Sequence, residues 1–353
     1  MTYRIEERLL HFKQPAGTSR GVYTTRKIWL VHLYDGDRHG VGECAPLPDL
    51  SCDFLPNYAE VLECHAGDRN HCDIPSACHS GSCPQRDILT TPGLRDYPSI
   101  LFGLETALLN LQNGNRLFDT AFSRGEVGIP INGLVWMGNH EEMLHRMEEK
   151  LEQGFHCIKL KIGGAIDFDQ ELDLIRRIRD RFSYHEVELR VDANGAFPFD
   201  EALYKLELLS QYNIHSIEQP IRQGQWAYMA QLCRESPLPI ALDEELIGVN
   251  DPEMKRHMLN IIKPRYIILK PSLHGGMSGC REWIDIARDM GVGSWITSAL
   301  ESNIGLNAIA QFASSVYGDN ITMPQGLGTG QLFTDNFDMG LEIIGDRLYK
   351  TSL

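Results

Sequence analysis

Three acidic residues and a lysine recur at nearly equal intervals in the middle of the chain. Asp192 and Glu218 are 26 residues apart, Glu218 and Asp243 are 25 apart, and Lys270 follows after another 27. Each ends a short apolar segment and begins a polar loop. A repeat of this length is typical of one strand, one loop, one helix and one return loop, the unit of parallel α/β proteins. The sequence therefore predicts an α/β fold in which successive units carry a charged side chain at the same position.

Side chains on a strand alternate between its two faces, so residues two apart share a face. By this rule Lys159 shares a face with Lys161, and Arg190 shares one with Asp192. If the strands close into a barrel, these charges converge at the carboxyl ends of the strands, where barrel enzymes carry their functional residues.

Apolar segments alternate with helical patterns from residue 129 onward. We predict eight strands, at residues 131–136, 155–161, 187–192, 214–218, 239–243, 266–270, 294–298 and 321–324. Helices are predicted between them, at residues 140–153, 168–182, 200–211, 223–235, 251–261, 277–290 and 303–315, with Asp167 as an N-cap. No glycine-rich phosphate loop follows any strand, so the pattern favours a (β/α)8-type (TIM-like) barrel over a doubly wound open sheet.

The first part of the chain does not show this repeat. Residues 27–34 and 40–44 predict a hairpin, residues 15–20 a short loop that ends at Arg20, and residues 99–113 a helix. We therefore expect three regions: an α+β capping domain at residues 1–125, the catalytic barrel at 126–325, and a C-terminal segment at 326–353 that packs back on the cap without a further β/α unit.

Composition narrows the class of protein. The net charge of −15 argues against a nucleic-acid partner, which normally requires a basic face. No apolar run approaches the roughly 20 residues that span a bilayer, and the start lacks an apolar signal segment, so we expect a cytoplasmic protein with no membrane partner. The sequence does not indicate an oligomeric state.

Nine cysteines, an odd number, favour reduced thiols over a disulfide framework in such a protein. Four of them, from Cys64 to Cys83, lie with three histidines in a stretch rich in Ser, Gly, Pro and Asp. A zinc site is one interpretation of this stretch. A polar insertion is the better one, because no paired C-x-x-C spacing is present.

Three carboxylates that converge would repel one another and be costly to desolvate unless a cation lay between them. Asp192, Glu218 and Asp243 offer only oxygen ligands, which favours Mg2+, or Mn2+ in its place. The alternative is that all three are merely exposed loop acids. Their matching intervals at strand ends argue for the metal site instead.

The lysines extend this hypothesis to chemistry. Lys161 and Lys270 come before and after the acids in strand order, so barrel closure would place them on opposite sides of the metal. An amine near a cation has its charged form disfavoured, so we expect a lowered pKa that would let either lysine act as a base. A metal-bound substrate carboxylate has acidified α-protons, which predicts proton abstraction next to a carboxylate. Lys159 has a simpler interpretation, as a source of positive potential.

Five motifs resemble the enolase superfamily, muconate-lactonizing subgroup, whose members pair a lysine or histidine base with Mg2+. They are Lys159-Leu160-Lys161, Val191-Asp192-Ala193-Asn194-Gly195, Ile217-Glu218-Gln219-Pro220, Ala241-Leu242-Asp243-Glu244 and Leu269-Lys270-Pro271. The resemblance spans the chain from the GVGECAPLP segment at residues 40–48 to Gly326-Leu327-Gly328-Thr329-Gly330. The Cys/His-rich stretch departs from the family pattern.

Within the subgroup, residues 275–279 and 297–306 most resemble the o-succinylbenzoate synthase family. The resemblance implies a lyase that dehydrates 2-succinyl-6-hydroxy-2,4-cyclohexadiene-1-carboxylate to o-succinylbenzoate in menaquinone biosynthesis. It implies that Asp192, Glu218 and Asp243 ligate Mg2+. It further implies that Lys161 removes the α-proton and then acts as the acid for the departing hydroxyl, while Lys270 stays cationic and stabilises the ene-diolate.

The resemblance also suggests where this small-molecule carboxylate substrate is held. Residues 15–20 would form part of a lid, and Ser298 and residues 326–329 would meet the succinyl group. Arg190 could reach a water or a carboxylate in the site, or else support the metal-binding acids. The full set of candidate substrate-binding or supporting residues is Lys159, Arg190, Asn194, Ser298, Glu301 and Arg20.

Other functions use the same lysine pair. A dipeptide epimerase or an N-acylamino-acid racemase needs two opposed lysines, since one removes the proton and the other returns it. Dipeptide epimerases of this subgroup carry an Asp-x-Asp motif near the end of the barrel, whereas residues 326–330 here read Gly-Leu-Gly-Thr-Gly, which favours the dehydratase. Nothing singles out a lactone-forming site of a muconate cycloisomerase. A barrel that serves only as a binding or scaffold protein would not keep the intact constellation.

Overall fold

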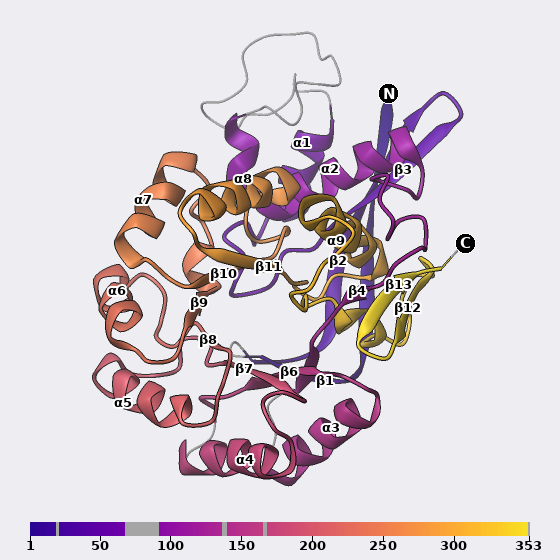
Figure 1. Ribbon diagram of the computed structural model, residues 1–353. Helices are drawn as coiled ribbons and strands as arrows, with labels where there is room; N and C mark the ends of the chain where they lie inside the picture. Colours follow the sequence, from indigo (N-terminus) through magenta and orange to yellow (C-terminus); the bar gives the residue numbers. More distant parts are fainter. Residues whose placement is uncertain (19–20, 68–91, 136–139, 165–167, 352–353) are drawn as a thin grey trace.

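The computed structural model describes residues 1–18, 21–67, 92–135, 140–164 and 168–351 of the chain. Figure 1 shows a curled sheet surrounded by helices, with an N-terminal sheet and a C-terminal hairpin beside it. The predicted α/β class is confirmed. Within the described residues, no helix combines the length and the apolar character that crossing a bilayer would require. The predicted N-cap Asp167, the lid residue Arg20 and most of the Cys/His-rich stretch lie outside the described residues.

Seven parallel strands form the curled sheet, hydrogen-bonded to one another in chain order. They are β5 (Gly133–Val135), β6 (Cys157–Lys161), β7 (Glu188–Asp192), β8 (Ser216–Glu218), β9 (Ile240–Leu242), β10 (Tyr266–Leu269) and β11 (Gly293–Ile296). Lys161 lies opposite Asp192 in the register, and Asp192 lies opposite Glu218. Three of the strand ends that the repeat predicted are therefore level in the sheet, whereas Glu218 pairs with Ala241 and Ala241 with Tyr266, so Asp243 and Lys270 lie further along their strands.

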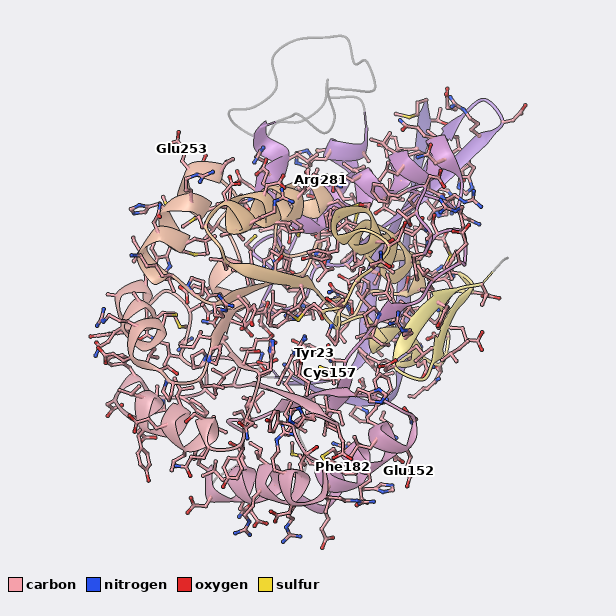
Figure 2. All side chains as sticks on the ribbon, viewed as in Figure 1. Tyr23, Glu152, Cys157, Phe182, Glu253 and Arg281 are labelled. Carbon is pink, nitrogen blue, oxygen red and sulfur yellow. The ribbon has the colours of Figure 1, made fainter. Side chains whose placement is uncertain are left out.

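An α-helix follows each of these strands in sequence, and the helices cover the outer face of the sheet (Figure 1). They are α3 (His140–Glu152), α4 (Phe168–Arg181), α5 (Phe199–Ser210), α6 (Trp226–Glu235), α7 (Pro252–Ile262), α8 (Gly276–Asp289) and α9 (Asn303–Tyr317). Helix α7 shows why they start where they do: Asp251 accepts a hydrogen bond from the Met254 N–H, and Pro252 is the first helical residue. The charged side chains of Glu152 and Glu253 lie at the rim of the molecule (Figure 2).

The N-terminal sheet consists of β1 (Thr2–Thr18), β2 (Gly21–Asp35) and β3 (Arg38–Cys44), all antiparallel. The 3-10 helix η2 (Pro92–Asp96) and the helices α1 (Tyr58–Ala66) and α2 (Pro98–Asn113) accompany it. Helix α2 packs so closely on β3 that a Cβ at Gly42 would clash with the Gly103 carbonyl oxygen. The predicted hairpin and helix are confirmed. The loop predicted at residues 15–20 is wrong for residues 15–18, because β1 pairs with β2 up to Thr18 after a register shift.

The predicted strand at residues 321–324 is also wrong. Pro324 has no N–H to donate to a strand ladder. Pairing begins one residue later, with isolated parallel bridges that join Gln325 to Ile131 and Gly326 to Thr297. These two bridges connect the segment to the residues just before β5 and to the end of β11.

The C-terminal segment carries a hairpin that the sequence did not predict. Its strands β12 (Leu341–Ile344) and β13 (Arg347–Lys350) form a three-stranded sheet with β4 (Ile129–Pro130). The same segment also meets β1, where Phe333 bridges Phe12. The C-terminal residues thus contact both the N-terminal sheet and the entry to the parallel sheet.

The cysteines correct one further expectation. Cys64, on α1, is disulfide-bonded. The prediction of reduced thiols is therefore wrong for this residue, because pairing depends on spatial proximity that residue spacing does not give. The free thiols among the described residues are those of Cys44, Cys52, Cys157, Cys233 and Cys280.

Candidate active site

The carboxyl ends of the parallel strands bring oppositely charged side chains into direct contact. The Lys159 ammonium lies 3.0 Å from an Asp192 carboxylate oxygen and 2.8 Å from a Glu218 oxygen. Lys161 donates to Asp192 at 2.6 Å, and Lys270 donates to Asp243. The structure therefore joins the predicted lysines and acids through direct contacts.

All three acids are buried. Asp192 and Asp243 are 0% exposed and Glu218 is 2% exposed. The interpretation as exposed loop acids is therefore wrong. Burying an ionised carboxylate is costly unless it is paired and hydrogen-bonded, and the lysine contacts supply this pairing.

Burial and neighbouring charges shift the pKa values of Asp192 and Glu218 in opposite directions. Burial raises the pKa of Asp192, but the positive charges of Lys159 and Lys161 lower it by more, so the net pKa lies below its usual range. Burial and the negative charge of Asp192 raise the pKa of Glu218 to about 8. Two carboxylates that share one lysine thus differ in how readily they hold a proton.

Carboxylates surround the lysines and set the direction of their pKa shifts. Burial lowers the pKa of Lys270, but the negative charges of Asp243 and Glu218 raise it by more, and the net shift is upward. The pKa of Lys159 shows the same balance, with Asp192 and Glu218 as the raising charges. The lowered pKa that we expected applies to a lysine beside a bound cation, whereas here the direct contact of Lys270 is the Asp243 carboxylate. A raised pKa suits a residue that stays cationic.

Asn194 and Glu244 extend the cluster. Lys161 donates to the Asn194 side-chain oxygen at 2.7 Å, and the Asn194 amide donates to Glu244 at 2.8 Å. The backbone φ of Asn194 is +45°, in the left-handed region that Asn tolerates, and its N–H donates to Asp192. Glu244 was not among the predicted site residues. Its position directly after Asp243 was the signal that could have identified it.

Buried carboxylate oxygens without a hydrogen bond indicate whether the three acids could bind a cation. Among the described residues, Glu218 Oε1 and Asp243 Oδ1 are buried and accept no hydrogen bond. Buried polar atoms nearly always have a partner, so hard oxygens of this kind fit Mg2+ or Mn2+. In this conformation the lysines are the partners of the carboxylates. No group of three or more His, Cys, Asp or Glu side chains in the described ranges is arranged to hold an ion.

A cavity of about 590 Å³ opens over the charged cluster. Its charged and amide lining residues include Lys159, Lys161, Asn194, Glu244 and Lys270. Leu47 and Leu50, from the segment after β3, contribute apolar surface, as do Ala299 and Leu300 after β11. The cavity thus combines a charged region with apolar walls, as expected for a site that binds a small carboxylate.

Ser298 and Thr329 line the same cavity and share a hydrogen bond of 2.5 Å. The structure therefore places Ser298 where the resemblance expected it. Glu301 is 0% exposed and does not line the cavity. Its carboxylate accepts hydrogen bonds from the Ser272 hydroxyl and, at 2.6 Å, from the Ala299 N–H. Glu301 thus joins two loops and does not offer its charge to a ligand.

The structure does not bring Arg190 into the charged cluster. Its guanidinium lies 2.8 Å from Glu188, donates to the Pro324 carbonyl at 2.9 Å, and lies over the Trp295 ring at 4.5 Å from the centroid. Arg190 and Asp192 share a face of β7, but the Arg190 side chain makes its contacts away from the acids. Neither role proposed for it, in substrate binding or in support of the metal acids, corresponds to these contacts.

Comparisons with known proteins identify relatives of this chain. The family model described as enolase C-terminal domain-like matches residues 142–339. The o-succinylbenzoate synthase of Desulfotalea psychrophila is 48% identical, over 99% of this chain and 98% of the relative. The crystal structure of MenC from the same organism superposes with a TM-score of 0.81 and 41% identity, and covers 98% of this chain and 99% of that one. An N-succinylamino acid racemase of Thermus thermophilus is 31% identical, over 82% of this chain and 75% of the relative.

Proposed function

This chain belongs to the enolase superfamily, and we propose that within it the chain acts as an o-succinylbenzoate synthase. The reaction is the dehydration of 2-succinyl-6-hydroxy-2,4-cyclohexadiene-1-carboxylate to o-succinylbenzoate in menaquinone biosynthesis. The observation that carries the proposal is the joining of Lys161 and Lys270, from β6 and the end of β10, to buried carboxylates beside one cavity. Full-length similarity to a synthase, at 48% identity, supports the choice of reaction.

The two lysines would divide the chemistry between them. Lys161 would take the proton next to the substrate carboxylate and then give it to the departing hydroxyl, so that water leaves and the ring becomes aromatic. Its contacts with Asp192 and Asn194 fix the position of its nitrogen. Lys270, with its raised pKa, would stay cationic and stabilise the negative charge that develops on the substrate.

Asp192, Glu218 and Asp243 would hold a divalent cation, Mg2+ or Mn2+. When bound, the cation would supply stabilisation of the negative charge on the substrate carboxylate. The unpartnered oxygens of Glu218 and Asp243 support this assignment, as does the divalent-metal dependence of the superfamily.

We further propose that the parallel sheet is a (β/α)8-type barrel. The bridges of Gln325 with Ile131 and of Gly326 with Thr297 support closure, with residues 325–326 in the place of an eighth strand. In this proposal residues 1–125 form an α+β capping domain, residues 126–325 the barrel, and residues 326–353 a segment that completes the cap. The pairing of Phe333 with Phe12 supports the last assignment.

The proposed reaction can be followed by the absorbance change when the cyclohexadiene carboxylate becomes aromatic. We expect turnover in the presence of Mg2+ and its loss with EDTA or in Lys161→Ala. Lys205→Ala is the matched control, because Lys205 pairs with Glu201 on α5 and does not line the cavity. Absence of turnover by the folded wild-type protein with Mg2+ would refute the proposed function.

A second candidate is an N-acylamino-acid racemase or dipeptide epimerase. It is favoured by the same lysine pair and by the 31% identity to an N-succinylamino acid racemase. Incubation in D2O with N-succinylamino acids and dipeptides tests it, because a racemase exchanges the α-proton for deuterium. Exchange without dehydration of the cyclohexadiene carboxylate would put this candidate first.

A further inference from the structure

A buried arginine joins the N-terminal sheet to the cavity. Arg26 lies on β2 and is 3% exposed. Its guanidinium donates to the carbonyl oxygens of Ala45 and Pro46, the latter at 2.6 Å, and to the Leu300 carbonyl at 3.2 Å. A buried guanidinium needs partners for its donors, and here backbone oxygens from two distant loops provide them.

The two loops form separate parts of the cavity lining. Ala45 and Pro46 lead directly to Leu47, which lines the cavity, and Leu300 lines it from the other loop. The backbone φ of Leu300 is +66°, in the left-handed region that a residue with a Cβ rarely adopts. The hydrogen bond from Arg26 to the Leu300 carbonyl helps to hold this strained conformation.

The same loop is connected to Lys270. Glu301 follows Leu300, and its carboxylate accepts from the Ala299 N–H and from Ser272, two residues after Lys270. The negative charges of Glu301 and Glu43 also stabilise the Arg26 guanidinium. A displacement of the Leu300 wall would therefore be transmitted to the loop that follows Lys270.

We propose that Arg26 is a positioning residue that fixes the spacing between the Leu47 wall and the Leu300 wall of the cavity. It touches neither the charged cluster nor a reacting atom. The expected effect of Arg26 on turnover rests on the proposed function. The expected effect of Arg26 on the two loops does not depend on that function.

The test is Arg26→Met, which keeps much of the length of the side chain and removes the donors. We expect KM to rise about tenfold or more and kcat to change by less than about threefold, because the walls bind parts of the substrate away from the reacting carbon. Where Arg26→Met does not fold, Arg26→Lys keeps the charge but cannot bridge both loops, and the same rise in KM is expected.

Arg179→Met is the matched control. Arg179, on α4, also binds three backbone carbonyls, those of Tyr212, Val187 and Asn213, at 2.7, 2.8 and 3.0 Å. None of these residues lines the cavity. A loss of stability without a change in KM is expected for this variant. Equal KM values for the two variants would overturn the proposal.

Two further measurements separate positioning from general damage. Methylguanidine should restore the KM of Arg26→Ala by filling the space of the side chain, and should leave Arg179→Ala unchanged. Backbone hydrogen exchange at residues 296–302 should be faster in Arg26→Met than in Arg179→Met. If the wild type does not turn over the proposed substrate, the exchange experiment still decides: equal exchange in the two variants overturns the positioning role, and faster exchange in Arg26→Met supports it.

Discussion

Glu105→Gln should change how the stability of this protein depends on pH. Glu105 lies on α2, is 5% exposed, and accepts hydrogen bonds from the N–H groups of Met277 and Ser278 at the start of α8. Burial raises its pKa to about 7, from an ordinary value of 4.5. The carboxyl is therefore protonated more readily in the folded chain than in the unfolded chain.

The sign and the size of the effect follow from this difference. A carboxyl with a raised pKa contributes stability that is complete below pH 4.5 and is lost as the pH rises through about 7. The difference between the pKa of Glu105 in the folded chain and its ordinary value corresponds to about 3 kcal/mol of unfolding free energy. The amide in the Glu105→Gln variant does not titrate. We therefore expect the unfolding free energy of the wild type, relative to Glu105→Gln, to fall by about 3 kcal/mol between pH 4.5 and pH 8.

Urea unfolding of both proteins at several pH values across this range measures the difference directly. Glu207→Gln is the matched control for the loss of one carboxyl, because Glu207 is exposed on α5. A difference between the wild type and Glu105→Gln that stays constant across the range would refute the reasoning, since it would mean that Glu105 does not bind a proton more tightly in the folded state.

Three other substitutions test the site. Asp192→Asn should remove measurable Mg2+ binding in calorimetry, and affinity equal to that of the wild type would contradict the metal assignment. Ser298→Ala should raise KM about fivefold, the equivalent of about 1 kcal/mol for one hydrogen bond, with kcat unchanged; an unaltered KM would exclude Ser298 from substrate binding. Arg190→Met should lower the unfolding free energy by about 2 kcal/mol, because it removes the ion-pair partner of Glu188, while KM stays within about twofold of the wild type. A large rise in KM would show that Arg190 takes part in substrate binding.

The sequence predicted the strand ends well because two regularities act together. The repeat length places Asp192, Glu218 and Asp243 at successive strand ends, and the register confirms that Asp192 and Glu218 are level. Alternation along β6 also puts Lys159 and Lys161 on one face, and both contact Asp192. Periodicity fixes which face a residue occupies and how far along a strand it lies, and these two properties located the cluster.

Periodicity does not fix which way a long side chain extends. Arg190 shares a face with Asp192, but its guanidinium is held by Glu188 and the Pro324 carbonyl. Periodicity also does not fix the direction of the pKa shift of Lys270, because that direction depends on which charges the ammonium contacts. The predicted eighth strand was wrong because Pro324 shifts pairing to Gln325 and Gly326. Each of these outcomes depends on contacts between residues distant in sequence.

The contacts of the N-terminal part of the chain show most clearly what periodicity does not predict. These contacts also indicate how this part of the chain supports the site. Glu43, at the end of β3, accepts hydrogen bonds from the N–H groups of Ser302 and Gly305 at the start of α9, 259 or more residues away. Glu105 does the same at α8. A carboxylate at a helix start satisfies unpaired N–H groups and complements the helix dipole. These two helices follow the strands that end near Lys270 and Ser298. The acids from the N-terminal part of the chain therefore fix the starts of the two helices whose preceding loops carry the candidate site.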